Sequence, residues 1–235
     1  MNPYRITDNY NDTPALDNRV STVMRNVYVR MTFGLLVTAL VALFCYSSPA
    51  VMGFFLGHSA AMWVLMIAEI GLVIAISGGI NRLSAGTATL LFYLFAAVNG
   101  LVLSPIFLVY THTSIAKTFF ITAATFGAMS IFGYTTRQDL TKFGSILFMA
   151  LIGLIIASLV NIFMHSSTLD WIISGAGVLV FVGLTAWDTQ KIKQMSAVAP
   201  TEAVSRLATI GALSLYLDFI NLFLYLLRFF GNSRD

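Results

Sequence analysis

Residues 203–230 read AVSRLATIGALSLYLDFINLFLYLLRFF. The run is long enough to cross a membrane, because about 20 apolar residues in a helix span the hydrocarbon core of a bilayer. It carries a carboxylate, Asp218, near its middle, where insertion scales put the cost of an aspartate at roughly 2.5–3.5 kcal/mol. An aspartate at this depth is therefore expected to have an interaction partner in the protein or a functional role. We therefore predict a membrane-spanning helix whose acidic residue faces protein or water.

Four polar side chains share one face of this predicted helix. They are spaced by four, three and four residues, and such offsets place side chains on one side of an α-helix. The other faces are mostly Leu, Ile and Phe. We therefore expect a polar stripe that faces the protein interior, made of Ser214, Asp218, Asn221 and Tyr225.

The composition of the whole chain is that of a polytopic membrane protein. Of its 235 residues, 58% are hydrophobic and only 10% are charged, whereas a soluble domain carries about 25% charged residues. The net charge of +3 comes from scattered basic residues, which disfavours nucleic acid as a partner. The single cysteine, Cys45, excludes an intrachain disulfide and a thiolate metal site.

Seven apolar segments predict an all-α fold, a seven-helix transmembrane bundle. Residues 26–235 are expected to form this one domain, and residues 1–25 a flexible polar tail. Pro105 is expected to kink the third span, and residues 188–202 to be the longest polar connection. The predicted spans are residues 27–46, 60–80, 87–110, 115–134, 143–164, 169–187 and 203–230.

The basic residues predict the orientation. With a cytoplasmic amino terminus, ten of the thirteen lysines and arginines lie inside, as the positive-inside rule requires. The last segment either crosses completely, which we prefer and which puts the carboxyl terminus outside, or re-enters and ends inside. The inside set is Arg5, Arg19, Arg25, Arg30, Arg82, Arg137, Lys142, Lys191, Lys193 and Arg206, and the outside set is Lys117, Arg228 and Arg234.

Two acidic residues lie at predicted membrane depth, Glu69 and Asp218, while Asp188 and Arg82 follow the cytoplasmic ends of two spans. If Asp188 and Asp218 meet, their mutual repulsion lets the pair share a proton near neutral pH. A neighbouring Arg82 could hold one carboxylate through a bidentate bridge. Loss of that bridge on protonation would loosen the cytoplasmic end, so the three residues outline a pH gate.

The same carboxylates are suited to a hard cation such as Ca²⁺, together with the Asn and Ser oxygens of the stripe. Two carboxylates fall short of the six to eight oxygens that Ca²⁺ prefers, so we predict a weak, partly hydrated transit site at Asp188 and Asp218. Glu69 either attracts cations along the same pathway or is a protonated carboxyl bonded to a neighbouring helix. We expect no tightly bound cofactor, and calcium as the permeant ligand.

Other chemistry is disfavoured. The three histidines lie in predicted outside loops and form no H-E-x-x-H zinc motif, and the last span has no lysine for a retinal Schiff base. The histidines are His58, His112 and His165.

Three motifs resemble those of one family, the Bax inhibitor-1 or transmembrane Bax inhibitor motif family. Residues 99–106, NGLVLSPI, resemble its G-x-x-L-x-P-I motif in the third span. Residues 187–192, WDTQKI, resemble its aromatic-Asp-T-Q-x-I segment, and residues 212–223, ALSLYLDFINLF, its A-L-x-L-Y-L-D-x-I-N-L-F segment. Their order and the seven-span layout extend the resemblance over nearly everything after residue 25.

The resemblance implies a pH-sensitive Ca²⁺ leak pathway gated by an Asp pair on the last two helices. Residue by residue, that pair corresponds to Asp188 and Asp218, the family's basic latch to Arg82, and its acidic residue within the second helix to Glu69. The short loops resemble those of a bacterial inner-membrane member, with the bilayer, calcium and other membrane proteins as partners.

Two alternatives remain beside the leak channel, which is not an enzyme. A regulatory scaffold would bind other membrane proteins without transport, and cation flux in liposomes would distinguish the two. An intramembrane aspartyl protease also needs an Asp on each of two adjacent helices. It is disfavoured because Asp218 follows Leu215-Tyr216-Leu217 rather than the glycines that open such a helix to substrate.

Overall fold

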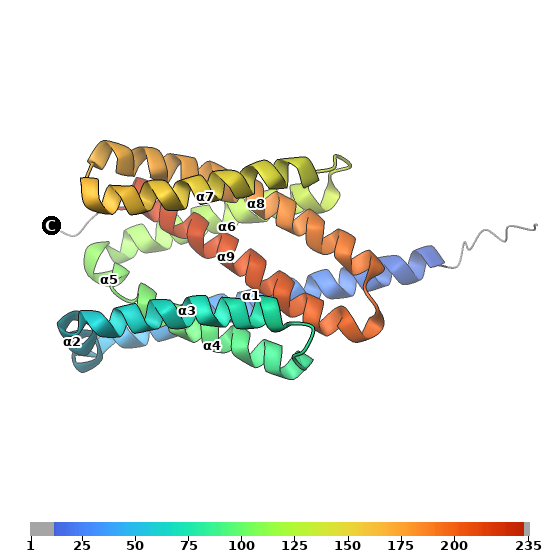
Figure 1. Ribbon diagram of the computed structural model, residues 1–235, viewed down its shortest axis with the longest axis horizontal. Helices are drawn as coiled ribbons and strands as arrows, with labels where there is room; N and C mark the ends of the chain where they lie inside the picture. Colours follow the sequence, from blue (N-terminus) through green and yellow to red (C-terminus); the bar gives the residue numbers. More distant parts are fainter. Residues whose placement is uncertain (1–11, 233–235) are drawn as a thin grey trace, which may run out of the picture.

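Residues 12–232 are described by the computed structural model, and within them the chain is helical, without a β-strand. This confirms the predicted all-α class. In chain order the elements are α1 (Asp12–Ser47), α2 (Pro49–Gly57), α3 (Ser59–Gly79), α4 (Ala85–Leu103), α5 (Ile106–Val109), α6 (His112–Thr135), α7 (Thr141–Met164), α8 (Ser167–Val198), the 3₁₀ helix η1 (Thr201–Ala203) and α9 (Val204–Phe230) (Figure 1).

Seven segments of the described chain are long and apolar enough to cross a membrane, as predicted. They are most of α1, α3, α4 together with α5, α6, α7, α8 and α9. Two prolines mark the ends of helices. Pro105 separates α4 from α5 and so interrupts the third span, because proline lacks a backbone N–H and clashes with the preceding turn. Pro49 opens α2, a short helix that we did not predict.

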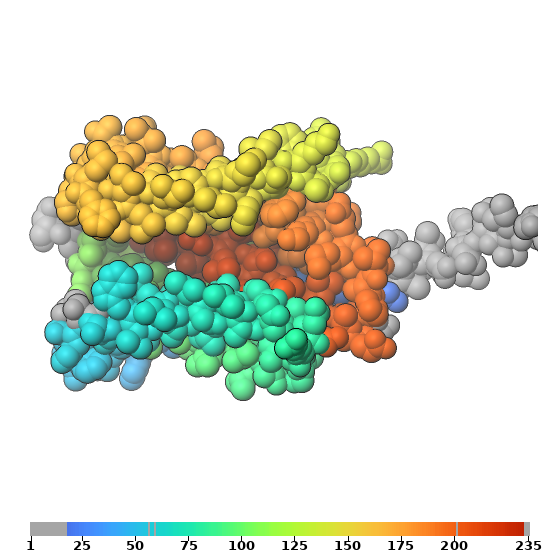
Figure 2. Space-filling view, in the orientation of Figure 1, coloured from blue at the N-terminus to red at the C-terminus, as the bar shows by residue number. Residues whose placement is uncertain are grey.

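α9 lies at the centre of the bundle. In the most apolar 18-residue stretch of α9, 67% of the residues are buried in the protein, whereas the corresponding share is 6% in α3 and in α7. Figure 1 shows α9 running obliquely between two groups of helices, α1, α3 and α4 on one side and α6, α7 and α8 on the other. In Figure 2 its middle is visible between α3 and α7. The stretch that combines apolar and polar faces is thus the one enclosed by the others.

The first helix begins earlier than we expected. We assigned residues 1–25 to a tail, but α1 already starts at Asp12, while residues 1–11 lie outside the described part. Val20, Val23, Met24 and Val27 are buried, and their helical spacing forms an apolar stripe. A search for uniformly apolar runs misses such an amphipathic start, because its other faces are polar.

The sixth span also extends further than predicted. Residues 188–202 were expected to be a polar connection, but α8 continues to Val198. Thr189, Ile192 and Ser196 are buried on the continuing helix, and the Ser196 hydroxyl donates to the Ile192 carbonyl at 2.6 Å. Packing against the bundle therefore maintains the helix where the sequence becomes polar. As a result Asp188 lies inside a helix rather than after one.

Most of the described lysines and arginines gather toward one end of the bundle, which we call the basic end. It holds the start of α1, the α3–α4 and α6–α7 connections, the end of α8 and the start of α9. There Arg19 donates to the Ala199 carbonyl at 2.8 Å, and Arg206 to that of Asn81 at 3.4 Å. The residues are Arg19, Arg25, Arg30, Arg82, Arg137, Lys142, Lys191, Lys193 and Arg206.

The described chain ends at the opposite end. The Asn232 N–H donates to the Ser114 hydroxyl at 2.9 Å, beside the start of α6. α9 is one unbroken helix between the two ends, as expected of a segment that crosses completely, the alternative that we preferred. Lys117 and Arg228 are the basic residues described near this end, while Arg5 and Arg234 lie outside the described residues. Which end is cytoplasmic stays a prediction.

Candidate functional site

Asp188 of α8 and Asp218 of α9 line one pocket of about 440 Å³. The walls come from α7, α8 and α9, and the apolar part includes Leu151 and Phe181. The polar lining contains every member of the predicted stripe. We call this site the acid pocket, and define it by Asp188, Lys191, Ser214, Asp218, Asn221 and Tyr225.

Asp218 is the most buried member of the acid pocket. Its side chain is 5% exposed, since Leu215, Phe219 and Leu222 around it on α9 are also buried. Its Oδ2 atom is buried and, in the described part of the chain, has no hydrogen-bond partner. Buried polar atoms are nearly always paired, so an orphan needs an explanation. A proton, a water molecule or a cation in the pocket would supply one.

Asp188 lies at the half-buried side of the pocket and interacts electrostatically with Asp218. Lys191, one turn further along α8, also lines the pocket and interacts with Asp188. Its ammonium group lies 4.7 Å from the centre of the Trp187 ring, a distance typical of a cation–π contact. The basic residue that lines the acid pocket is therefore Lys191 of α8, rather than the predicted Arg82.

Tyr225 occupies the side of the acid pocket that faces the opposite end of the bundle. Its ring stacks on Phe181 with centroids 5.7 Å apart and rests on Gly177, where a Cβ atom would come within 2.6 Å of the ring. Its hydroxyl interacts with Ser158 of α7. Asn221 bonds back to its own helix through the Leu217 carbonyl at 2.8 Å.

Arg82 lies elsewhere in this conformation. It is exposed in the turn between α3 and α4 and is not among the residues that line the acid pocket. The structure thus brings the two predicted carboxylates to one pocket and leaves the predicted arginine outside it.

Glu69 belongs to a separate polar network that joins four helices. Its Oε1 accepts from Asn99 Nδ2 at 2.7 Å, Asn99 Oδ1 accepts from the Tyr216 hydroxyl at 2.9 Å, and that hydroxyl also contacts Thr38 Oγ1 at 2.5 Å. Tyr216 and Asp218 point to opposite sides of α9, because two positions turn a helix by roughly 200°. Glu69 is bonded to a neighbouring helix, and its role in cation movement stays a prediction.

Removing the Tyr216 hydroxyl should destabilise the protein. Tyr216→Phe leaves Asn99 Oδ1 without its buried donor, which costs about 1–3 kcal/mol of unfolding free energy and lowers the thermal unfolding temperature in detergent. Glu69→Gln is the matched control, because the amide keeps the oxygen that accepts from Asn99, so its stability should stay near that of the wild type. Equal stability of Tyr216→Phe and wild type would contradict the structural role.

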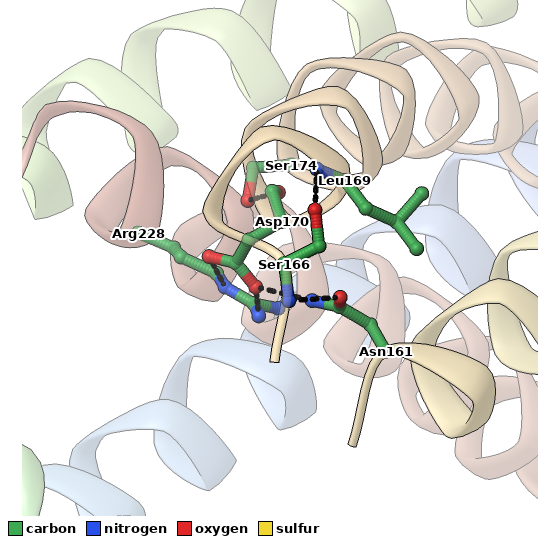
Figure 3. A network of polar contacts seen from close by, with 6 residues as sticks. All are labelled: Asn161, Ser166, Leu169, Asp170, Ser174 and Arg228. Carbon is green, nitrogen blue, oxygen red and sulfur yellow. Dashed lines mark hydrogen bonds and ion pairs between the residues drawn. The ribbon is translucent and has the colours of Figure 1, made fainter. Parts of the chain in front are cut away.

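A second polar cluster, missed by the sequence analysis, lies at the opposite end between α7, α8 and α9 (Figure 3). Arg228 forms an ion pair with Asp170, and its Nε donates to Asp170 Oδ2 at 2.7 Å. Asn161 donates to Asp170 Oδ1 at 3.3 Å and accepts from the Ser166 N–H at 3.1 Å. These residues border a hollow of about 610 Å³ that Ser158 also lines. We call this the outer cluster.

The sequence holds a signal for the outer cluster. Asp170 lies in the first turn of α8 and Arg228 in the last turn of α9, the helix ends where an acid and a base are favoured by the helix dipole. Adjacent antiparallel helices bring such ends together. His165 adopts a left-handed backbone conformation, with φ of 50°, which turns the chain from α7 toward α8. The three histidines are all exposed.

Comparison with known sequences assigns the family. The family described as "Inhibitor of apoptosis-promoting Bax1" matches residues 20–235. The chain belongs to the Bax inhibitor-1 family. The resemblance predicted from three motifs is thereby confirmed, and the acid pocket lies between the helices that carry two of them.

Proteins from three bacteria are similar to this chain over nearly its whole length. The inner membrane protein YbhL of Escherichia coli K12 is 53% identical over 218 residues, which cover 92% of this chain and 93% of YbhL. A protein of Borreliella burgdorferi is 48% identical, covering 90% and 92%, and one of Rickettsia prowazekii is 46% identical, covering 94% of both chains. This Bax inhibitor-1 family member is an integral membrane protein.

Proposed function

We propose that this protein is a pH-sensitive calcium leak pathway of the bacterial inner membrane, gated by a proton on the Asp188–Asp218 pair. One observation carries the proposal, namely the buried and unpartnered Oδ2 of Asp218 in a pocket with a second carboxylate. The similarity to YbhL supports the inner-membrane location, and the positive-inside rule supports placing the basic end in the cytoplasm.

The acid pocket has the ligands and the volume for a partly hydrated cation. Two carboxylates and the oxygens of Ser214 and Asn221 fall short of a complete Ca²⁺ shell, and the described residues include no cluster of three or more acidic, histidine or cysteine ligands. A water molecule takes about 30 Å³ in the liquid, so about 440 Å³ leaves space for several waters beside an ion. These properties suit passage rather than storage.

The route to the opposite end leads past Tyr225. Its ring borders the acid pocket, and its hydroxyl contacts Ser158, which lines the hollow of the outer cluster. Both spaces lie between α7, α8 and α9. We assign access from the outside to this path, with the Asp170–Arg228 ion pair at its mouth.

The sign of the pH response follows from the charges at the pocket. When the pair carries negative charge, a neighbouring cation attracts it and holds the helices closed. Protonation at lower pH removes this attraction, so the leak should rise as the pH falls. Apart from the O–H bond of the gating proton, no covalent bond is made or broken in this cycle. Both Asp residues lie within unbroken helices, so we propose no enzymatic activity and, in particular, no proteolysis.

Two single substitutions identify the cation that closes the gate. Lys191→Gln removes the positive charge at the acid pocket, and we expect a several-fold higher Ca²⁺ leak near neutral pH in proteoliposomes. Arg82→Gln tests the latch predicted from the family resemblance. For Arg82 to act as this latch, its side chain would have to move from the exposed turn to the acid pocket. A higher leak in Arg82→Gln alone would assign the latch to Arg82, whereas two variants as tight as wild type would reject a basic latch.

The proposal is tested by Ca²⁺ flux into liposomes that contain only the purified protein, measured from mildly acidic to mildly alkaline pH. A flux that increases at acidic pH supports the gated leak. A protein that carries no flux at any pH would instead support the regulatory scaffold, whose partners are other membrane proteins.

A further inference from the structure

An apolar groove of about 650 Å³ runs between α1 and α6, away from the acid pocket. Phe219 of α9 lies among its lining residues, and Tyr28 of α1 bonds across to Ser130 of α6 at 2.8 Å. On α1 the lining extends from Ser21 to Leu35, which corresponds to about 21 Å of helix. Half of a hydrocarbon core of about 30 Å is shorter than this, so the groove is long enough for an acyl chain of one leaflet.

A polar pocket of about 540 Å³ adjoins the groove at the basic end. Tyr134 lines both spaces. Lys193 of α8 stands at the junction, because its Nζ donates to the Tyr134 carbonyl at 2.7 Å and lies 4.7 Å from the centre of the Tyr134 ring. An ammonium group has three donors, so two remain for a ligand. Arg137, which is exposed, lines the same pocket.

One acidic residue, Asp139, also lines this polar pocket. Its Oδ1 accepts from the Thr141 N–H at 2.9 Å, and hydrogen bonds with Thr141 lower the pKa of the Asp139 carboxyl group. Its negative charge therefore interacts with the start of α7, where the helix dipole favours an anion. The pocket lining holds two cations, Lys193 and Arg137, and this one carboxylate, so its net charge is positive.

We infer that the groove and the polar pocket together bind one anionic phospholipid from the leaflet at the basic end. An acyl chain lies in the groove between α1 and α6, and the phosphate lies at Lys193 and Arg137. Two observations carry this assignment independently, the apolar groove at membrane depth and the cations where it reaches headgroup level. Basic pockets between transmembrane helices on the cytoplasmic side are suited to anionic headgroups, and Tyr134 is a residue type enriched at that level.

Lipid binding is measured on the detergent-purified full chain by native mass spectrometry and by thermal unfolding. Phosphatidylglycerol should bind and raise the unfolding temperature, while phosphatidylcholine with the same acyl chains and inorganic phosphate alone should do neither. The Arg137→Gln/Lys193→Gln double variant should bind phosphatidylglycerol about 25-fold more weakly, since each basic residue contributes about a factor of five.

Gly127→Leu tests the groove separately. Gly127 lines it, and a Cβ atom there meets nothing within 4 Å, so a leucine side chain should extend into the groove and reduce phosphatidylglycerol binding severalfold. Gly153→Leu is the matched control, because Gly153 is equally open but lies on α7 outside the groove. Equal binding of the two lipids, equal stabilisation by inorganic phosphate, or full binding to Gly127→Leu would each overturn the inference.

Discussion

Asp218→Asn should remove the pH dependence of Ca²⁺ flux and leave the pathway open. Asparagine has the shape of a protonated aspartic acid and no charge at any pH, so the variant mimics the protonated pair. A gate controlled by one proton changes its open fraction by up to about tenfold per pH unit. We therefore expect wild-type flux to rise by about that factor per unit as the pH falls through the titration of the pair, and the variant to show high, flat flux.

Asp188→Asn is the companion of this variant. Asp188 is only half-buried and has Lys191 beside it, so its loss should flatten the pH profile less than the loss of Asp218. Ser214→Ala serves as a control because it removes a hydroxyl of the same pocket without changing charge. An Asp218→Asn protein with the pH profile of wild type would rule out the acid pair as the sensor, whatever the absolute flux.

Gly133→Ala should have the largest effect on stability. A Cβ atom at Gly133 of α6 would overlap the backbone carbonyl group of Ala186 on α8. Backbone cannot rotate away as a side chain can, so the two helices must separate. Overpacking of this kind costs about 1–3 kcal/mol and sometimes more. Ala186 lies two residues before Asp188, so the separation should also disturb the acid pocket.

The control for this prediction lies on the same helix. Gly127→Ala adds the same methyl group where nothing lies within 4 Å of the new Cβ atom. Alanine favours a helix over glycine by about 1 kcal/mol, so this variant should unfold at the same or a higher temperature than wild type in detergent. The unfolding temperatures of the two variants are compared with that of the wild type. A Gly133→Ala protein as stable as Gly127→Ala would contradict the close α6–α8 packing.

Most of the fold was accessible from the sequence. The seven spans, the interruption at Pro105 and the gathering of basic residues toward one end follow from the free energy of placing apolar or charged groups in a bilayer. These are properties of single segments and need no knowledge of their neighbours. The start of α1 and the extension of α8 were missed, because both depend on packing of an apolar stripe that other helices cover.

The candidate site was only partly accessible. The polar stripe of α9 follows from helical periodicity, and the pairing of Asp188 with Asp218 follows from the family motifs. Lys191 at the acid pocket and the Asp170–Arg228 pair were not predicted, and the bond from Glu69 to a neighbouring helix was one of two alternatives that the sequence left open. Each of these depends on which helix lies beside which, and side chains from distant segments meet only after the bundle has assembled.

By itself, the amino-acid sequence determined that this chain crosses the membrane seven times and that its last helix is apolar with one polar face, since hydropathy and the helical repeat are local properties. Only the tertiary structure decided that α9 lies at the centre, that Asp218 has a buried oxygen without a partner, and that Arg82 stands apart from it. The physical reason is that burial and electrostatic contact depend on distances between segments, which close packing of the helices sets.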